Sequence, residues 1–312
     1  DNEEVGTLDT SFDGVNKMHQ MIKNSIGDNM YNVFADCPHR EKLGWLEETQ
    51  LMYSSVAYNF DIASFSRKIS TDMMDAQKSN GSVPSIVPPY AVGVHALRPN
   101  SSGDTPNDPT WCGANILVPW YSYQLYGDAV QLEKAYPSMK RYMEYLKSLV
   151  EKSGTEFILE NGDLNRDLGD WVAIEKSDVS LVVTATYYKL ADAMSNIADT
   201  LGESADSEAY AQLAENIKTA FNEKWFNYET ASYNTGTQAE NGIPLDYGMV
   251  PEGYEERVAE NIAKDVTEHD NHLTAGEVGL NPMFRSLSEY GYADLVYKMM
   301  MNETQPSYYF FV

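Results

Sequence analysis

The sequence predicts an all-α fold, built as a closed ring of helical hairpins around a central cavity. Three observations predict it. Apolar residues recur at three- and four-residue steps over most of the chain, strand patterns are scarce, and short and long connections alternate between the helices. A helical solenoid is the competing architecture, but it would show a sequence repeat, and none is visible. We therefore expect one domain over residues 1–312, with its long loops on one face.

Segments 12–26 and 129–150 carry their apolar residues on one face of a helix, and other expected helices begin or end at a capping residue. The segment 177–202 is an example, because it starts with Ser-Asp and stops at Gly202. In chain order, the expected helices span residues 12–26, two stretches within 46–79 that are interrupted near Asn59, 113–127, 129–150, 177–202, 207–226, 253–267 and 283–301.

Strands are expected only as short arms, at 154–162 and 231–238. Two long loops are expected, at 80–111 and 152–176. Long loops in a compact domain usually carry function, so they are the first places to look for a site.

The composition restricts the class of ligand. The net charge is −25 in 312 residues, so the chain repels phosphate backbones, and nucleic acid is excluded as a partner. Cys37 and Cys112 have no metal-ligand spacing, so neither a zinc site nor another cofactor is expected. No apolar run is long enough to span a membrane. A small neutral ligand fits this composition. A periplasmic or extracellular location is favoured without being fixed, and the oligomeric state is not readable.

The stretch "DCPHREKLGWLEETQ", residues 36–50, concentrates acids around one tryptophan. If the segment is helical, Glu41 and Trp45 share a face, because they are four residues apart. Desolvation by an indole disfavours the charged carboxylate, and a protonated carboxyl is what a general acid at a glycosidic oxygen needs. The alternative is a surface helix start with acids near its N-terminus. The residues alone leave both open.

Residues 36–45 resemble the signature of the α-L-rhamnosidases of glycoside hydrolase family 78. Further stretches resemble the family in the same order. They read "DPTWCGANILVPWYSYQLYGD", "DLGDWV", "HLTAGEVGL" and "QPSYYFF". The resemblance implies an (α/α)6 barrel that removes terminal α-L-rhamnose with inversion at the anomeric carbon. It also implies that the last helices of the barrel lie outside this chain.

By this resemblance, Glu41 matches the proton donor. Asp36 and Arg40 match residues that hold the sugar hydroxyls, and Trp45 matches a wall of the sugar site. Glu48 stands where the family usually has Asp and matches a substrate-binding residue, although Leu46-Glu47 replaces the Thr-Gly that precedes it in the family.

Other expected substrate-binding residues lie farther along the chain. Trp111 and Trp171 match aromatic walls, and Asp170 accompanies the latter. Each Trp could instead be a loop anchor packed on the core. His272 could line the site or cap a helix, and its sequence context does not decide between the two.

An inverting glycosidase needs a second carboxylate as its base. The resemblance places it beyond the segment that contains Pro306, so the base is expected after Val312, and this chain alone is expected to be weak or inactive. Glu240 and Asp246, read as members of a polar loop, could approach the cavity, but nothing assigns them that role.

Three other functions compete with this reading. One is an (α/α)6 glycosidase of different sugar specificity, which the departure before Glu48 could indicate. Another is a non-catalytic carbohydrate-binding module. The last is a helical interaction scaffold, which does not explain why tryptophans and acids gather in the long loops.

Overall fold

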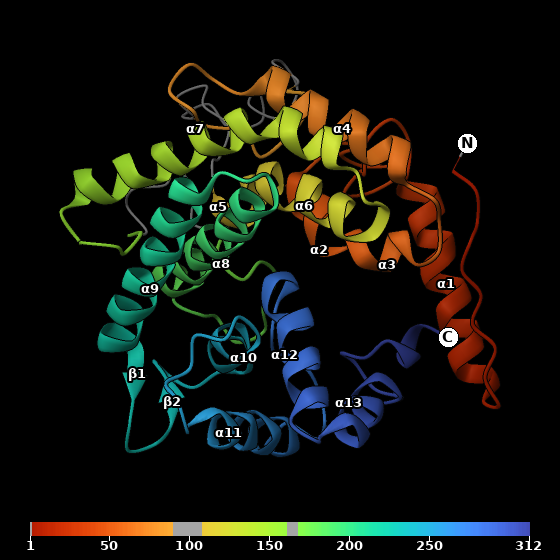
Figure 1. Ribbon diagram of the computed structural model, residues 1–312. Helices are drawn as coiled ribbons and strands as arrows, with labels where there is room; N and C mark the ends of the chain where they lie inside the picture. The colour runs from red at the N-terminus through yellow and green to blue at the C-terminus, as the bar shows by residue number, and fades with distance from the viewer. Residues whose placement is uncertain (1, 90–107, 161–167) are drawn as a thin grey trace. The chain divides into compact units, whose positions relative to one another are not determined.

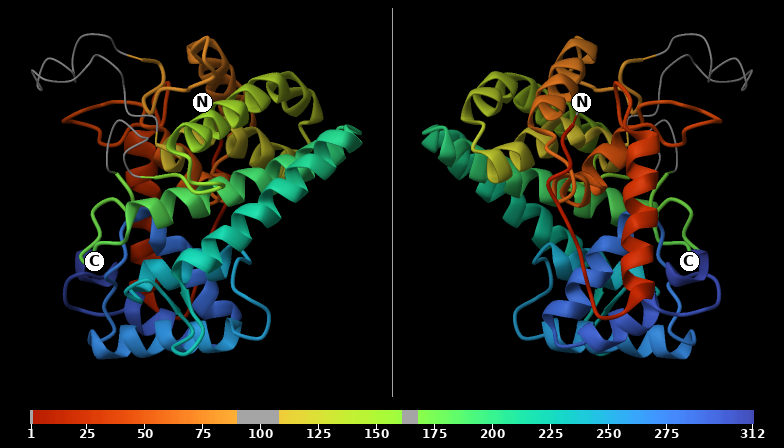
Figure 2. Two further views of the ribbon diagram at one scale, coloured as in Figure 1. Left: turned by 90° about the vertical axis from the view of Figure 1, so that its left-hand side faces the viewer. Right: turned by 90° about the vertical axis from the view of Figure 1, so that its right-hand side faces the viewer.

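The computed structural model describes residues 2–89, 108–160 and 168–312. Most of these residues are helical, as the sequence predicts, and helices make up most of the ribbon in every view (Figures 1 and 2). None of the described helices combines the length and the apolar character that a membrane span requires. The predicted loops 80–111 and 152–176 are described in part, because 90–107 and 161–167 lie outside the described residues.

The chain divides into two compact units, which we describe separately. The first comprises Asp1–Thr7, Asn24–Asp167 and Thr186–Glu215, and the second comprises Leu8–Lys23, Leu168–Ala185 and Asn216–Val312. Three helices contribute residues to both units: α1 (Asp13–Asn29), α8 (Val179–Thr200) and α9 (Ser204–Trp225).

The first unit is organised around helix α6, which packs against α2, α4 and α7 (Figure 1). Its first six residues, Ala114–Pro119, are all buried, which explains why this segment reads as nearly continuously apolar. The complete helices of this unit are α2 (Leu46–Leu51), α3 (Tyr53–Ala57), α4 (Ala63–Ala76), α5 (Pro109–Cys112), α6 (Ala114–Tyr126) and α7 (Ala129–Ser153).

The second unit is organised around helix α10, which is buried from Gln238 to Leu245 and packs against α11 and α12 (Figure 1). A short antiparallel hairpin precedes it, with Phe226 opposite Tyr233. The elements that lie wholly in this unit are β1 (Phe226–Asn227), β2 (Ser232–Tyr233), α10 (Gln238–Asp246), α11 (Glu255–Glu268), α12 (Glu277–Glu289), α13 (Ala293–Met300) and the 3-10 turn η3 (Tyr309–Phe311).

Helix α6 ends where the sequence predicts, whereas α7 runs on to Ser153, past its predicted end at residue 150. Helices α6 and α7 end at Gly127 and Gly154, whose φ angles of 70° and 72° are left-handed and therefore favour glycine. Asp128 begins α7, because its Oδ1 accepts a hydrogen bond from the amide of Gln131 at 3.2 Å.

Three expectations about elements are wrong. The segment 283–301 is not one helix, because α12 and α13 are separated by a turn in which Gly291 has a φ of 90°. No strand forms over 154–160, the described part of the first expected arm. The expected polar loop around Glu240 and Asp246 is helix α10. The missed signal is the Thr-x-x-Glu pattern of residues 237–240, since Thr237 caps the helix and its side chain accepts a hydrogen bond from the amide of Glu240.

Candidate active site

Residues 36–45 form a loop that directly precedes helix α2, and two hydrogen bonds join its ends. The amide of Asp36 donates to the carbonyl of Leu43 at 3.1 Å, and the amide of Leu43 donates to Asp36 Oδ1 at 3.0 Å. Lys42 has a φ of 59°, which turns the chain back. Gly44 is needed for close packing, because a Cβ there would lie 2.4 Å from the carbonyl oxygen of Val87. The sequence thus fixes a tight loop that presents the side chains between its ends.

Glu41 lies in this loop and contacts Trp45. The indole Nε1 donates a hydrogen bond to Glu41 Oε2 at 3.0 Å, and Arg40 Nη2 lies 3.4 Å from Oε1. The predicted pairing of Glu41 with Trp45 is confirmed, but the expected geometry is wrong. Glu41 is in a turn and not in a helix, and it meets the edge of the indole through the N–H group. Its side chain is 36% exposed, so the carboxyl can exchange protons with a bound molecule.

A residue that the sequence reasoning missed lies between the two acids. The thiol of Cys37 donates to Asp36 Oδ2 at 2.8 Å and accepts from the amide of Glu41 at 3.1 Å. Cys37 therefore links the predicted sugar ligand to the predicted proton donor. The signal was its position directly after Asp36. Cys37 and Cys112 are both free thiols.

Two more predicted residues lie in the helices of the first unit. Glu48 is half-buried in α2. Trp111 is 3% exposed in α5, a short helix that Asp108 caps by accepting from the amide of Thr110 at 2.9 Å. The side chain of Gln50, in α2, donates to the carbonyl of Thr110. Trp111 is thus buried where two helices meet, and its role as a sugar wall stays a prediction.

Asp170, in the second unit, is tied to the start of helix α12. Its Oδ2 accepts from the amide of Gly276 at 2.7 Å, and its Oδ1 accepts from the amide of Gly279 at 2.9 Å. Burial raises the pKa of Asp170, and these amide hydrogen bonds act in the opposite direction. Both oxygens of Asp170 are used within the chain, so its contact with a sugar also stays a prediction.

The backbone and the side chain of Trp171 differ in environment. The carbonyl oxygen accepts from the amide of Glu277 at 2.9 Å, whereas the side chain is 45% exposed. Gly276 allows this approach, because a Cβ there would lie 2.2 Å from the carbonyl oxygen of Trp171. The indole is therefore available to a ligand, while the backbone that carries it hydrogen-bonds to the start of helix α12.

The ring of His272 bridges two neighbours. Its Nδ1 lies 3.0 Å from the carbonyl oxygen of His269, which follows α11, and its Nε2 lies 2.8 Å from Thr304 Oγ1. Gln238, which the sequence reasoning missed, hydrogen-bonds to the loop that contains His272. Its buried amide donates to the carbonyl of His272 at 3.2 Å and accepts from the amide of Thr274 at 2.8 Å. These contacts correspond to the helix-capping alternative, and a role in sugar binding stays a prediction.

Glu240 and Asp246 are engaged in structural contacts. Glu240 is fully buried and accepts hydrogen bonds on both oxygens, from Asn234 Nδ2 at 2.7 Å and Thr235 Oγ1 at 2.7 Å among others. Asp246 forms a two-pronged ion pair with Arg285, at 2.7 and 2.6 Å. Both carboxylates are thus engaged by contacts within the second unit.

The predicted site residues thus fall into two sets, each arranged within its own unit. The first set is Asp36, Arg40, Glu41, Trp45, Glu48 and Trp111, and the second set is Asp170, Trp171 and His272.

Comparison with known proteins relates the chain to sugar-cleaving enzymes. Residues 3–312 match the family model of the bacterial alpha-L-rhamnosidase 6 hairpin glycosidase domain. An alpha-L-rhamnosidase of Formosa agariphila is 29% identical over 98% of this chain and 33% of its own length. One of Streptomyces avermitilis is 28% identical over 96% of this chain and 27% of its own length. The chain therefore spans about a third of the length of the relatives it matches.

Solved structures agree. The alpha-L-rhamnosidase from Dictyoglumus thermophilum superposes with a TM-score of 0.89 at 32% identity, over 99% of this chain and 34% of that one. The Streptomyces avermitilis alpha-L-rhamnosidase complexed with L-rhamnose gives a TM-score of 0.88 at 25% identity, over 99% of this chain and 28% of that one. These likenesses confirm the predicted all-α fold class, that of the (α/α)6 six-hairpin glycosidases, and the expected absence of the last helices stays a prediction.

Proposed function

The chain belongs to the family of bacterial α-L-rhamnosidase six-hairpin glycosidase domains, and from this membership we propose that it is the catalytic part of an α-L-rhamnosidase. The enzyme removes terminal α-L-rhamnose from oligosaccharides or glycosides. The observation that carries the proposal is the Asp36–Trp45 loop, which presents an exposed carboxyl held by an indole N–H and an arginine.

Glu41 is proposed as the general acid of an inverting hydrolysis. Its carboxyl gives a proton to the glycosidic oxygen as the bond to the anomeric carbon breaks, and water attacks that carbon from the opposite face. The water loses a proton to a second carboxylate, and the products are free rhamnose and the aglycone alcohol. The indole N–H of Trp45 and the guanidinium of Arg40 orient the carboxyl before proton transfer and stabilise the carboxylate afterwards.

The sugar is proposed to be bound by polar groups and by aromatic surface. Asp36 and Arg40 are suited to hydroxyl groups, because carboxylates accept two hydrogen bonds and guanidinium groups donate several. The exposed indole of Trp171 offers apolar surface to the methyl group at C5 of rhamnose. We place Glu48, Trp111, Asp170 and His272 around the same sugar on the strength of the sequence resemblance alone.

The base is not proposed among the acids of α10, since Glu240 and Asp246 are engaged within the fold. The sequence resemblance puts it after Val312. Release of an aryl α-L-rhamnoside by this chain, compared with a version extended at its C-terminus, tests this placement. Equal and high rates from both would contradict it.

The role of Glu41 is tested with substrates of different leaving groups. Glu41→Gln is expected to lose the most activity on natural rhamnosides, because a poor leaving group depends on protonation, and the least on activated aryl rhamnosides. Glu252→Gln, which removes an exposed acid elsewhere in the chain, is the matched control. An unchanged rate of Glu41→Gln on a natural rhamnoside would remove Glu41 from this role.

A different sugar specificity is the second candidate, favoured by the Leu46-Glu47 pair that precedes Glu48. A panel of aryl glycosides discriminates between the two, since the proposal requires α-L-rhamnoside to be cleaved fastest. Sugar binding without turnover in the full-length protein would favour a carbohydrate-binding module instead.

A further inference from the structure

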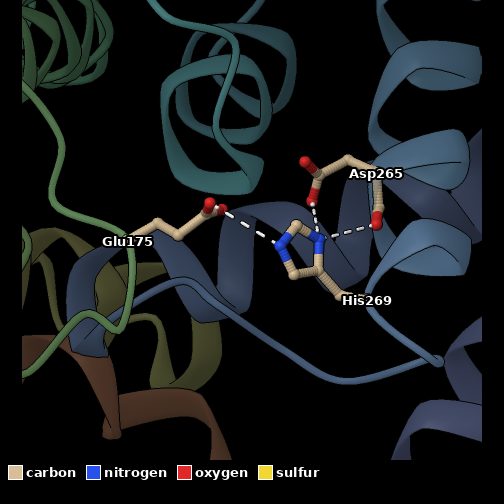
Figure 3. Close-up of side chains that lie close together, drawn as sticks. All are labelled: Glu175, Asp265 and His269. Carbon is tan, nitrogen blue, oxygen red and sulfur yellow. Dashed lines mark hydrogen bonds and ion pairs between the residues drawn. The ribbon is translucent and has the colours of Figure 1, made fainter.

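Three titratable side chains of the second unit, none of them a predicted site residue, lie close together. Asp265 and His269 lie at the C-terminal end of α11, and Glu175 lies in the segment that follows Trp171 (Figure 3). His269 Nε2 is 3.6 Å from Glu175 Oε1, and His269 Nδ1 is 3.2 Å from Asp265 Oδ1. The two carboxylates approach the imidazole from opposite sides, so each ring nitrogen faces its own carboxylate (Figure 3).

This arrangement suits a doubly protonated imidazole. An imidazolium has an N–H group on each nitrogen, whereas neutral imidazole has one. In the neutral ring the proton is retained at Nδ1, because Nδ1 lies 2.9 Å from the carbonyl oxygen of Asp265, which accepts its hydrogen bond. The lone pair of Nε2 then faces the carboxylate of Glu175. Loss of a proton therefore breaks the contact with Glu175 and keeps the contact with Asp265.

The surrounding charges favour the imidazolium. The hydrogen bond to the Asp265 carbonyl raises the pKa of His269, and the charges of Asp265 and Glu175 act in the same direction. Burial raises the pKa of Asp265, while Gln238 and His269 act against this shift, and the charges of Glu175 and Glu268 reinforce it. Because the pKa of His269 is raised on folding, its contribution to stability is complete below the ordinary value of about 6.5. That contribution is lost as the pH rises through the folded value.

Glu175 connects this group to the exposed indole. It lies four residues after Trp171, and the segment between them hydrogen-bonds to the loop before α12. The amides of Ile174 and Glu175 donate to the carbonyl of Thr274 at 2.9 and 3.2 Å. A contact that holds the Glu175 side chain therefore also restrains the short segment that carries Trp171.

We propose that Glu175, His269 and Asp265 form a clamp that closes when His269 is protonated and fixes the segment that carries Trp171. His269 is then a positioning residue for sugar binding, with Asp265 orienting its ring. The clamp rests on the proposed function only in that Trp171 is taken to cover a sugar.

The first test measures the clamp without any sugar. The pKa of His269 is followed by NMR in the full-length protein and in Glu175→Gln, which keeps the shape of the side chain and removes its charge. The midpoint is expected above the ordinary value for histidine in the wild type and lower in Glu175→Gln. Glu268→Gln is the matched control, because Glu268 is an exposed acid at the same helix end that pairs with Lys264 at 3.8 Å. An equal shift in both variants, or a wild-type midpoint that is not raised, would overturn the clamp.

The second test measures its effect on binding. The dissociation constant for L-rhamnose is compared at about pH 5.5 and about pH 8.5, on either side of the histidine midpoint. We expect wild-type binding to weaken by about two- to five-fold at the higher pH, the range given by a partly exposed ion pair. Glu175→Gln should bind with the weaker constant at both pH values, and Glu268→Gln should follow the wild type. The same pH dependence in Glu175→Gln would refute the positioning role.

Two further outcomes are informative. If L-rhamnose binds at neither pH, the proposed function fails, and the clamp is judged by the NMR midpoint and by hydrogen exchange of the amides of Ile174 and Glu175. These amides should exchange faster in Glu175→Gln than in the wild type at the lower pH. A chelator should leave both readouts unchanged. A change on chelation would overturn the clamp in favour of a metal ion held by the same three side chains.

Discussion

Replacement of Glu240 by glutamine is the sharpest test of how the second unit is held together. The buried carboxylate accepts four hydrogen bonds. On Oε1 they come from the amide of Asp178 at 3.0 Å and Asn234 Nδ2 at 2.7 Å. On Oε2 they come from the amide and the hydroxyl of Thr235, at 3.1 and 2.7 Å. Glu240 thus joins α10 to the segment that follows β2 and to the start of α8.

Glutamine keeps the shape of the side chain but has one acceptor oxygen, so its NH2 group must face one of the two donor pairs. The hydroxyl of Thr235 can rotate away, but a backbone N–H cannot. An unsatisfied buried donor costs about 1–3 kcal/mol, and hydrogen bonds to a charged group are worth more than neutral ones. We expect the free energy of unfolding to fall by about 2–4 kcal/mol, a large part of the roughly 5–15 kcal/mol typical of proteins.

Urea unfolding, followed by circular dichroism, measures this loss as a lower midpoint at unchanged slope. Glu260→Gln, which alters an exposed acid on α11, is the control and should change stability by less than about 0.5 kcal/mol. A loss below about 1 kcal/mol in Glu240→Gln would refute the reasoning, because the unmet donor alone costs that much.

Three other predictions follow from a close backbone approach, a hydrogen bond and a buried thiol. Gly276→Ala should lower the melting temperature, because its Cβ would lie 2.2 Å from the carbonyl oxygen of Trp171, whereas Gly27→Ala, with no atom within 4 Å of its Cβ, should not; equal effects in a thermal scan would contradict this. Trp45→Phe keeps the aromatic surface but removes the N–H donor to Glu41. The loss of about 1 kcal/mol expected at this partly exposed site corresponds to a roughly five-fold slower hydrolysis of natural rhamnosides, and an unchanged rate would show that the contact does not orient the acid. Only Cys37 should react with a thiol reagent in the native protein, because Cys112 is fully buried and burial raises the pKa of its thiol; rapid reaction of Cys112 in the folded state would count against its burial.

Local sequence patterns predicted most helices, because their apolar residues must face a core at a fixed spacing. Gly127 and Gly202 followed their helices as expected, because the left-handed backbone that ends a helix is a local feature of the chain. Helix α10 was missed because its central Asn-Gly and Pro244 read as a loop. Burial on all sides stabilises this helix despite poor propensity, and burial depends on partners far away in the sequence.

The candidate site, like the fold, was predictable only where its contacts are local in the sequence. The pairing of Glu41 with Trp45 was visible from spacing, but the spacing suggested a helix, whereas a turn closed by Asp36 and Leu43 brings the two together. The environment of Asp170 was not predictable, because its partners lie more than 100 residues away, at 276 and 279.

The attachment of Asp170 and Trp171 to the start of α12 limits how this scaffold can be re-engineered. Segments 168–176 and 272–279 interlock through backbone amides and through glycines that admit no side chain. A loop graft that exchanges the first segment alone would leave the amides of Gly276 and Gly279 without their acceptor. A library aimed at a new aglycone should therefore transplant both segments as one cassette and vary only the outward-facing positions.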